Sequence, residues 1–252
     1  MSKKENQMSI TKRQESILAL LDEHGYMTVE RLSSLTYTSP SSIRRDLTHL
    51  ENMSLVKRTH GGASSHTEVG QVVPFSSRMA KNVAEKRRIA RAASELITDG
   101  MTVMLDGSTT AGFLIPYIAK HRDITLFTNN MLTAINGVNH GIVTHCIGGV
   151  AIGGSAVLSG ERAYAEVERI NPDVLFFSSR GLDRDGNISD PVPEEHHLRE
   201  LMLRNARFSV FLCDSGKFGT KSLYTLTNLD KINACVFDKP WAELKTECKV
   251  IY

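Results

Sequence analysis

Hydrophobic residues recur at helical spacing through the first fifty positions and predict three short helices. The first covers residues 10–25, where Gly25 is suited to end a helix. The second covers residues 28–35, with Thr28 as its N-cap. The third covers residues 39–51, with Ser39 as N-cap followed by a proline at the first helical position. Apolar side chains at i, i+4 and i+7 give this third helix one buried stripe: Ile43, Leu47 and Leu50.

A tight turn at residues 36–38 joins the last two helices, which gives the order of a helix-turn-helix motif. Residues 55–62 continue with apolar positions, then basic ones, then two glycines, which predicts a β-hairpin wing. Small hydroxyls and paired arginines on the exposed side of a helix suit a DNA major groove, and basic hairpin residues suit phosphates. A solvated helix face and an ordinary exposed edge are the plain alternatives. The candidate DNA contacts are Thr28, Ser39, Ser41, Ser42, Arg44, Arg45, Lys57, Arg58 and His60.

The pattern changes after this region. Residues 64–80 lack periodicity and are rich in small polar residues, which predicts a linker. From there helix and strand signals alternate, which indicates a doubly wound α/β domain with a mainly parallel sheet. We therefore predict a DNA-binding domain at 1–63, a linker at 64–80 and an α/β domain at 81–252. The predicted helices are 82–97, 109–120, 131–138, 161–170 and 194–206, and the predicted strands are 101–105, 124–128, 142–147, 173–177, 208–212, 234–237 and 249–252.

Small polar residues follow several of the predicted strands. Ligands of parallel α/β sheets bind at the carboxyl ends of the strands, and free N–H groups at a helix start suit phosphate. A glycine turn with a plain N-cap would look the same at any single strand end. Five polar strand ends together, with a lysine among them, favour an anionic small molecule. The candidates are Asp106, Gly107, Ser108, Thr109, Thr110, Thr128, Asn129, Gly148, Gly149, Gly181 and Lys217.

Composition limits the classes of protein that this chain can belong to but does not identify its function. The net charge is only +2, so any DNA-binding field must come from clustered side chains. The four cysteines are scattered, and the start of the chain has no apolar segment, so we expect a cytoplasmic protein with reduced thiols and no membrane span. We predict no cofactor and no metal. His196 and His197 could be read as metal ligands, but neighbouring helical residues point about 100° apart.

Four segments within residues 13–63 resemble the winged helix of the DeoR/GlpR family of bacterial regulators. They are Arg-Gln-Glu-Ser-Ile-Leu from Arg13, Val-Glu-Arg-Leu from Val29, Ile-Arg-Arg-Asp-Leu from Ile43, and Arg-Thr-His-Gly-Gly-Ala from Arg58. The family usually has glycine in the turn before the recognition helix, where this chain has Tyr37. If that position requires a positive φ, the tyrosine is strained there.

The second half resembles the effector domain of the same family. The matching segments begin at Asp106, Thr128, Gly148, Gly181 and Asp214. The resemblance implies a domain like ribose-5-phosphate isomerase that binds phosphorylated sugars. The family tends to have lysine where this chain has Arg199, which we add to the effector-binding candidates. Two further departures are the order Gly107-Ser108 and the glycine at Gly216.

The resemblance implies a transcription repressor whose operator affinity responds to a phosphorylated sugar. Its partners would be double-stranded operator DNA and further copies of itself, as a homodimer or homotetramer, because half-sites require paired winged helices. The alternative is a sugar-phosphate isomerase with a helical appendage, since a fold does not fix activity. The sequence does not separate a repressor from an activator.

Overall fold

The structure is a computed structural model and describes residues 10–24, 26–53, 55–59, 61–65, 75–152 and 154–252. The chain forms two compact units, Met1–Lys81 and Asn82–Tyr252. No helix of the described part is long and apolar enough to cross a membrane. The two units are described in turn.

The N-terminal unit has the three predicted helices and the predicted hairpin. A third strand, too short to show a period in the sequence, joins the hairpin in a sheet of order β1-β3-β2. Apolar side chains of all these helices meet the hairpin in one buried core. The elements are α1 (Lys12–His24), β1 (Tyr26–Thr28), α2 (Val29–Leu35), α3 (Pro40–Asn52), β2 (Val56–Thr59) and β3 (Gly62–Ser65). Gly25, the predicted end of the first helix, lies outside the described residues.

An ion pair between the buried Asp46 and the half-exposed Arg13 fixes α3 against α1. The Asp46 carboxylate on α3 is 2.6 Å from Arg13 Nε, and Gln14 Nε2 donates to it at 3.1 Å. A side-chain pair between two helices sets their relative rotation, because both carboxylate oxygens are used. Asp46 therefore belongs to the inner side of α3, opposite the side that faces solvent.

The predicted linker contains regular structure at both ends. Strand β3 runs to Ser65, and a short helix α4 (Phe75–Ala80) occupies the last third of the segment. Ser76 Oγ donates to the carbonyl of Met53 at 3.1 Å, so α4 is bonded to the N-terminal unit. The polar composition of 64–80 concealed this helix, because six residues give less than two turns of periodicity. Residues 66–74 lie outside the described part.

The C-terminal unit is built on a seven-stranded sheet whose neighbouring strands are all parallel, in the order β15-β14-β12-β9-β4-β5-β6. The chain builds outward in one direction from β4 and then in the other from β9. Between these two strands lies the topological switch point of the sheet. The strands are β4 (Thr102–Leu105), β5 (Thr125–Thr128), β6 (Val143–Cys146), β9 (Val174–Phe177), β12 (Ser209–Cys213), β14 (Ala234–Phe237) and β15 (Lys249–Ile251).

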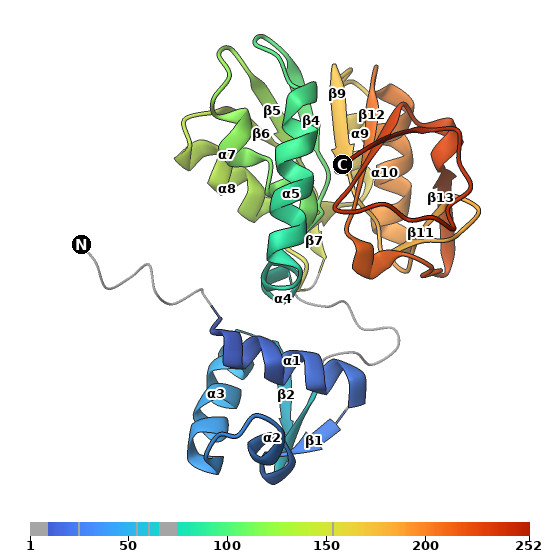
Figure 1. Cartoon of the computed structure of the whole chain (residues 1–252). Coiled ribbons are helices and arrows are strands. Elements are labelled where there is room, and N and C mark those ends of the chain that lie inside the picture. The colour runs from blue at the N-terminus through green and yellow to red at the C-terminus, as the bar shows by residue number, and fades with distance from the viewer. Residues whose placement is uncertain (1–9, 25, 54, 60, 66–74, 153) are drawn as a thin grey trace. The chain divides into compact units, whose positions relative to one another are not determined.

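The helices that accompany the sheet in the described part of this unit are α5 (Val83–Ala93), α6 (Thr109–Gly112), α7 (Ile115–Ile118), α8 (Met131–Asn139), α9 (Glu161–Val167) and α10 (Pro193–Asn205). The single helix predicted over 109–120 is two short helices. The amides of Phe113 and Leu114 donate three residues back, to Thr110 and Ala111, and Pro116 has no N–H. Helices α7 and α8 lie beside β5 and β6, whereas α10 lies toward the other end of the sheet (Figure 1).

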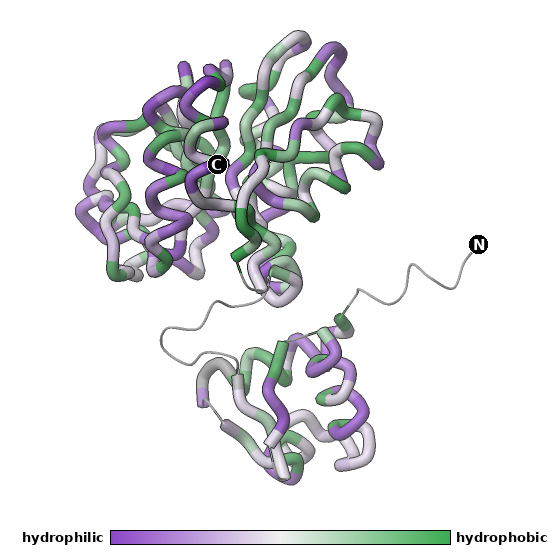
Figure 2. Tube along the Cα trace, turned by 180° about the vertical axis from the view of Figure 1, so that it is seen from behind, coloured by the Kyte–Doolittle hydropathy of each residue, from purple (hydrophilic) through white to green (hydrophobic). Residues whose placement is uncertain are grey.

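Alternate residues of the strands enter two separate cores. Val103 and Leu105 of β4 face the core that includes α5, and Met104 faces the core that includes α9 and α10. Hydrophobic residues gather along these inner strands in Figure 2. A sheet with both faces covered explains why its strands read as continuous apolar runs.

Shorter strands extend the unit and were not predicted. A hairpin of β7 (Val150–Ile152) and β8 (Val157–Ser159) follows β6, and a three-stranded antiparallel sheet joins β10 (Gly181–Leu182), β11 (Asn187–Asp190) and β13 (Tyr224–Asn228). Three 3₁₀ segments complete it: Ser94–Leu96, Ser215–Lys217 and Leu229–Lys231. These pieces are too short for a period to identify them.

Candidate functional site

The exposed side of α3 is the candidate nucleic-acid interface. Ser39 Oγ accepts the N–H of Ser42 at 3.3 Å, as expected of an N-cap, and lies 3.0 Å from the hydroxyl of Ser41. Arg44 and Arg45 are exposed on the side opposite the buried stripe. Arg44 Nη2 is 3.8 Å from Glu30 Oε1, a long surface ion pair that contributes little to stability. The helix thus presents hydroxyls and two guanidinium groups to solvent.

The wing is tied to this same face. Arg58 Nη1 on β2 donates to Thr48 Oγ1 on α3 at 3.0 Å, and Lys57 beside it is exposed. Thr28 Oγ1 accepts the N–H of Arg31 at 3.1 Å, so this side chain caps α2 as predicted. His60 lies outside the described residues. The structure therefore brings the wing and the exposed side of α3 together.

Tyr37 occupies the turn between α2 and α3 with a φ of +50°. A left-handed conformation costs a residue with a Cβ about 1–2 kcal/mol, which explains why glycine suits this position. The tyrosine side chain is 97% exposed, so it does not pack to offset this cost. The sequence-based expectation of strain at Tyr37 agrees with this backbone.

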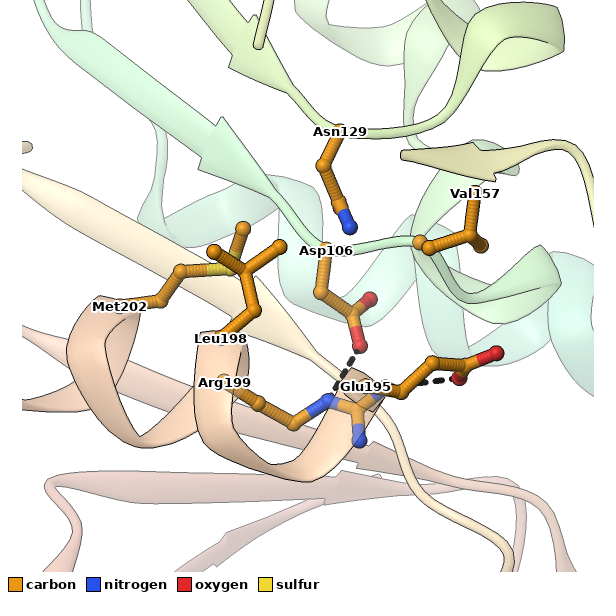
Figure 3. Close-up of a pocket in the computed structure, with 8 residues that line it drawn as sticks. Asp106, Asn129, Val157, Glu195, Leu198, Arg199 and Met202 are labelled. Atoms are coloured by element: carbon orange, nitrogen blue, oxygen red, sulfur yellow. Dashed lines mark hydrogen bonds and ion pairs between the residues drawn. The ribbon is translucent and has the colours of Figure 1, made fainter. Parts of the chain in front are cut away.

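The candidate effector-binding site lies at the switch point between β4 and β9. A small cavity of about 10 Å³ there has room for roughly one water molecule (Figure 3). Residues that follow β4 and β5 form one wall, and the first turns of α10 form the other. The lining residues are Asp106, Gly107, Asn129, Val157, Glu195, Leu198, Arg199 and Met202.

Asp106, directly after β4, holds the strand ends together. Its carboxylate accepts the N–H of Ser108 at 3.1 Å and the N–H of Ser178, after β9, at 3.2 Å. It also accepts Arg199 Nε from α10 at 2.9 Å. One buried carboxylate therefore joins two strand ends to the helix across the cavity.

Arg199 is buried, with 4% of its side chain exposed, and is surrounded by acids. Besides Asp106 it pairs with Asp190, and its Nη2 is 3.6 Å from Glu195 Oε2. Burial lowers the pKa of the Arg199 guanidinium, but Asp190 and Asp106 outweigh burial and hold that pKa above its ordinary value. The arginine stays charged, and that charge is already balanced by protein carboxylates.

Lys217 reaches the same region from the loop after β12. Its Nζ donates to Ser178 Oγ at 2.8 Å and lies 3.4 Å from Asp214 Oδ2. Asp214 also accepts Asn82 Nδ2 at 2.6 Å. A Cβ at Gly216 would lie 2.8 Å from that Nδ2, so the departure from serine here makes room for Asn82.

Replacing Asp214 by Asn should lower the unfolding free energy of this unit at pH 7 by about 1–2 kcal/mol. Burial raises the pKa of the Asp214 carboxyl, but Lys217 and the Asn82 hydrogen bond outweigh burial and hold that pKa below its ordinary 3.8. A depressed pKa gives stability that is present above pH 3.8 and is lost as the pH falls further. Urea unfolding should therefore show the two proteins converging as the pH falls below 3.8. A pH-independent difference would contradict this assignment.

Of the predicted effector residues, the structure brings four to the cavity: Asp106, Gly107, Asn129 and Arg199. Eight do not line it: Ser108, Thr109, Thr110, Thr128, Gly148, Gly149, Gly181 and Lys217. Several of these have local backbone roles. Ser108 caps α6, Thr128 Oγ1 accepts the N–H of Asn130, and the amide of Gly148 donates to Glu166. Gly149 and Gly181 allow close approach of neighbouring backbone.

Sequence reasoning missed four lining residues. Glu195, Leu198 and Met202 lie within four positions of Arg199 on α10, so helical spacing could have identified them. Val157 carried no signal, because it comes from the short strand β8. A Cβ at Gly107 would lie 2.6 Å from Val157 Cγ2, so the glycine leaves the space that this side chain fills.

Arg180, after β9, was also missed. Its N–H donates to Asp190 Oδ1 at 3.3 Å, whereas its guanidinium makes no hydrogen bond or ion pair with any described residue. Burial lowers the pKa of Arg180, and the charges of Glu195 and Asp190 work against that lowering. Arg180 is therefore a partly buried cation close to the acids that surround Arg199.

Asn129 offers the cavity an unused acceptor. Its Nδ2 donates to the carbonyl of Leu158 at 3.1 Å, and its buried Oδ1 has no hydrogen-bond partner within the described chain. A buried acceptor without a partner is costly, and a ligand hydroxyl would satisfy it.

His196 and His197 each pair with Glu200, and the described residues contain no group of three metal-ligating side chains.

Comparison with known proteins covers both units. Residues 13–69 match the family described as the DeoR-like helix-turn-helix domain, and residues 81–239 match the DeoR C terminal sensor domain. The glycerol-3-phosphate regulon repressor of Escherichia coli is 27% identical, over 92% of both chains. A ribose 5-phosphate isomerase of Methanocaldococcus jannaschii is 15% identical over 55% of both chains, with a TM-score of 0.42.

The L-fucose operon activator of Haemophilus influenzae is 32% identical, over 90% of this chain and 91% of its own length. The family is one of regulators, and the Escherichia coli and Haemophilus influenzae relatives are named as regulators, which decides against the isomerase alternative. Because both units match one family and this relative spans nearly the whole chain, the chain belongs to the DeoR family and is a DNA-binding transcriptional regulator, not an enzyme.

Proposed function

We propose that this regulator represses a carbohydrate-metabolism operon and that a phosphorylated sugar, bound at the switch point between β4 and β9, changes its affinity for operator DNA. The observation that carries the proposal is the convergence there of four strand ends, a cavity and three cations. The Escherichia coli relative is named a repressor of a glycerol-3-phosphate regulon, which supports both parts. The fucose relative is named an activator, so repression by this regulator needs its own test against activation.

The DNA-binding half of the proposal rests on the α3 face and the wing. The Arg44 and Arg45 side chains would contact base edges, because guanidinium groups pair with guanine in the major groove. Ser39, Ser41 and Ser42 would contact phosphates or bases near the helix start. Lys57 and Arg58 would contact the backbone beside the groove, as would Thr28 at the start of α2. The regulator would act in the cytoplasm on double-stranded operator DNA, as a homodimer or homotetramer.

The sensor half assigns different roles to the cations. Arg199 is already balanced by three carboxylates, so it positions Asp106 and Glu195 more than it attracts an anion. Arg180 has no ion pair within the described chain, and we assign it to the ligand phosphate together with Lys217. The unused Asn129 Oδ1 would accept a sugar hydroxyl.

Ligand entry also requires a conformational change. A cavity of about 10 Å³ is too small for a sugar phosphate, and the Glu195 carboxylate, 3.6 Å from Arg199 Nη2, lines it (Figure 3). A ligand phosphate near Arg180 would repel this carboxylate and favour its displacement. A ligand shifts a conformational equilibrium only by its difference in affinity between two states, and this repulsion supplies such a difference.

The test is binding to a labelled fragment of the regulator's own promoter, titrated with pentose, hexose and triose phosphates. One of these should change operator affinity about 10-fold or more, within the usual range of allosteric coupling. Lys217→Ala and Arg180→Ala should remove the response while operator binding without ligand persists. Arg184→Ala, an exposed arginine paired with Glu243, is the control and should respond normally.

Two results would contradict the proposal. Full responses in both cation variants would remove the phosphate assignment, and a response to unphosphorylated sugars only would change the ligand class. Transcription from the promoter, compared with and without the regulator, separates a repressor from an activator. Higher transcription without the regulator is the expected outcome.

A further inference from the structure

The outer face of α8 reverses the usual pattern of a surface helix. The helix buries small side chains, Thr133, Ala134 and Gly137, against the sheet. It exposes large apolar ones, which we name the α8 face: Met131, Leu132, Ile135 and Val138. Ile135 is 58% exposed and Val138 is 61% exposed. A surface helix normally presents polar residues to solvent, so this face has the composition of an interface core.

The stretch of sequence that carries the α8 face contains no charged side chain. Residues 124–160 contain no Lys, Arg, Asp or Glu, although charged residues make up 23% of the chain. This segment includes α8, the edge strand β6 and the hairpin of β7 and β8. Interface cores are depleted of charged residues relative to other protein surfaces. The depletion therefore covers α8 and the strands that follow it in the sequence, and a pocket at the end of α8 brings the charged Asp123 beside His140 and Gly141.

Strand β6 adds a second exposed feature at the same end. It is the last strand of the seven-stranded sheet, and Val143 on it is 63% exposed. Proteins usually protect such an edge with charged side chains, especially lysine, or with proline. Strand β6 reads Val-Thr-His-Cys and has none of these protections. An unprotected edge beside an apolar helix indicates that this end is covered in the working protein.

We infer that the α8 face is the homodimer interface of this regulator, with α8 of one copy packed against α8 of a second. An uncharged apolar face suits an identical partner, because a two-fold axis sets each patch against itself and like charges would repel there. A different protein recognised through charge would instead require charged side chains around the face, and residues 124–160 have none. Helix-turn-helix regulators read paired half-sites, so a second copy is also the partner that DNA binding requires.

The test measures the mass of the full chain by light scattering during gel filtration, at micromolar concentration. The wild-type protein should elute at twice the 27.9 kDa chain mass or a larger even multiple. Ile135→Glu combined with Val138→Glu should halve that mass, because two buried carboxylates would face two others across the axis. Leu223→Glu is the matched control, since Leu223 is 76% exposed outside the α8 face. That variant should keep the wild-type mass.

Folding can be monitored separately from association. Both substituted positions are exposed and glutamate is a good helix former, so the far-UV circular dichroism of the double variant should match the wild type. A variant with Ile135→Lys and Val138→Lys should show the same halved mass, and mixing it with the glutamate variant should restore the wild-type mass through opposite charges. A folded glutamate variant of unchanged mass, or a monomeric wild type, would overturn the inference.

Discussion

Arg44→Ala and Arg45→Ala should each weaken operator binding about 10- to 100-fold, because a bidentate arginine–guanine contact contributes roughly 1–3 kcal/mol. Both side chains are exposed on α3, and the fold does not depend on them, since the buried stripe and the Asp46 pair hold the helix. Fluorescence anisotropy with a labelled promoter fragment measures the change. A scrambled fragment should lose much less affinity than the operator, because specificity is lost together with the base contact.

The control for these variants is Arg204→Ala, which removes one exposed arginine from the C-terminal unit. It should bind the operator as the wild type does. If both α3 variants kept a wild-type footprint while folded, the exposed side of α3 would not be the recognition surface. If they lost operator and scrambled fragments equally, the arginines would contact phosphates instead of bases.

The N-terminal unit could be predicted well because its signals are local. Caps and helical spacing identify α2 and α3, and the structure confirms Thr28 and Ser39 as their N-caps. Strand β1 was missed because three residues show no period, and its pairing with β3 is a contact across more than thirty positions. Tyr37 shows the reverse case, in which a departure from the family pattern correctly pointed to a left-handed backbone.

The C-terminal sheet was predictable for a similar reason. Strands buried on both faces read as apolar runs, and all seven sheet strands were expected near their observed positions. The candidate site was only partly predictable. Strand ends identify Asp106 and Asn129, because the rule for parallel sheets places them at one rim. The distance between strand ends is not written in the sequence, so Gly148 and Gly181 could not be separated from them.

The roles of charged residues depended most on the tertiary structure. The sequence suggested Arg199 as an anion-binding cation, but the fold surrounds it with Asp106, Asp190 and Glu195. Arg180 gave no signal, because its lack of an ion pair with any described residue appears only in the folded structure. Sequence reasoning finds the rim of such a site, whereas the balance of charges within it requires coordinates.

Arg199→Met should lower the unfolding free energy of the C-terminal unit by about 3–5 kcal/mol, which is the usual cost of removing one partner from a buried ion pair. The side chain is 4% exposed, so water cannot replace it beside the carboxylates. Trp241 is the only tryptophan and stacks on Phe218 in this unit, so its fluorescence during urea unfolding reports this unit separately. Arg204→Met, on the exposed side of the same helix, should change stability by less than about 0.5 kcal/mol.

A second substitution distinguishes lost charge balance from lost packing. If Arg199→Met destabilises because Asp190 and Asp106 are left without a cation, adding Asp190→Asn and Asp106→Asn should recover part of the loss. If the loss comes from packing, these substitutions should leave it unchanged or enlarge it. Arg199→Lys should fall between wild type and Arg199→Met, because an ammonium keeps the charge but cannot reach Asp106 and Asp190 with separate nitrogens. A loss below about 1 kcal/mol for Arg199→Met would show that the carboxylates do not need this cation, and Arg199 would then be free to bind the effector.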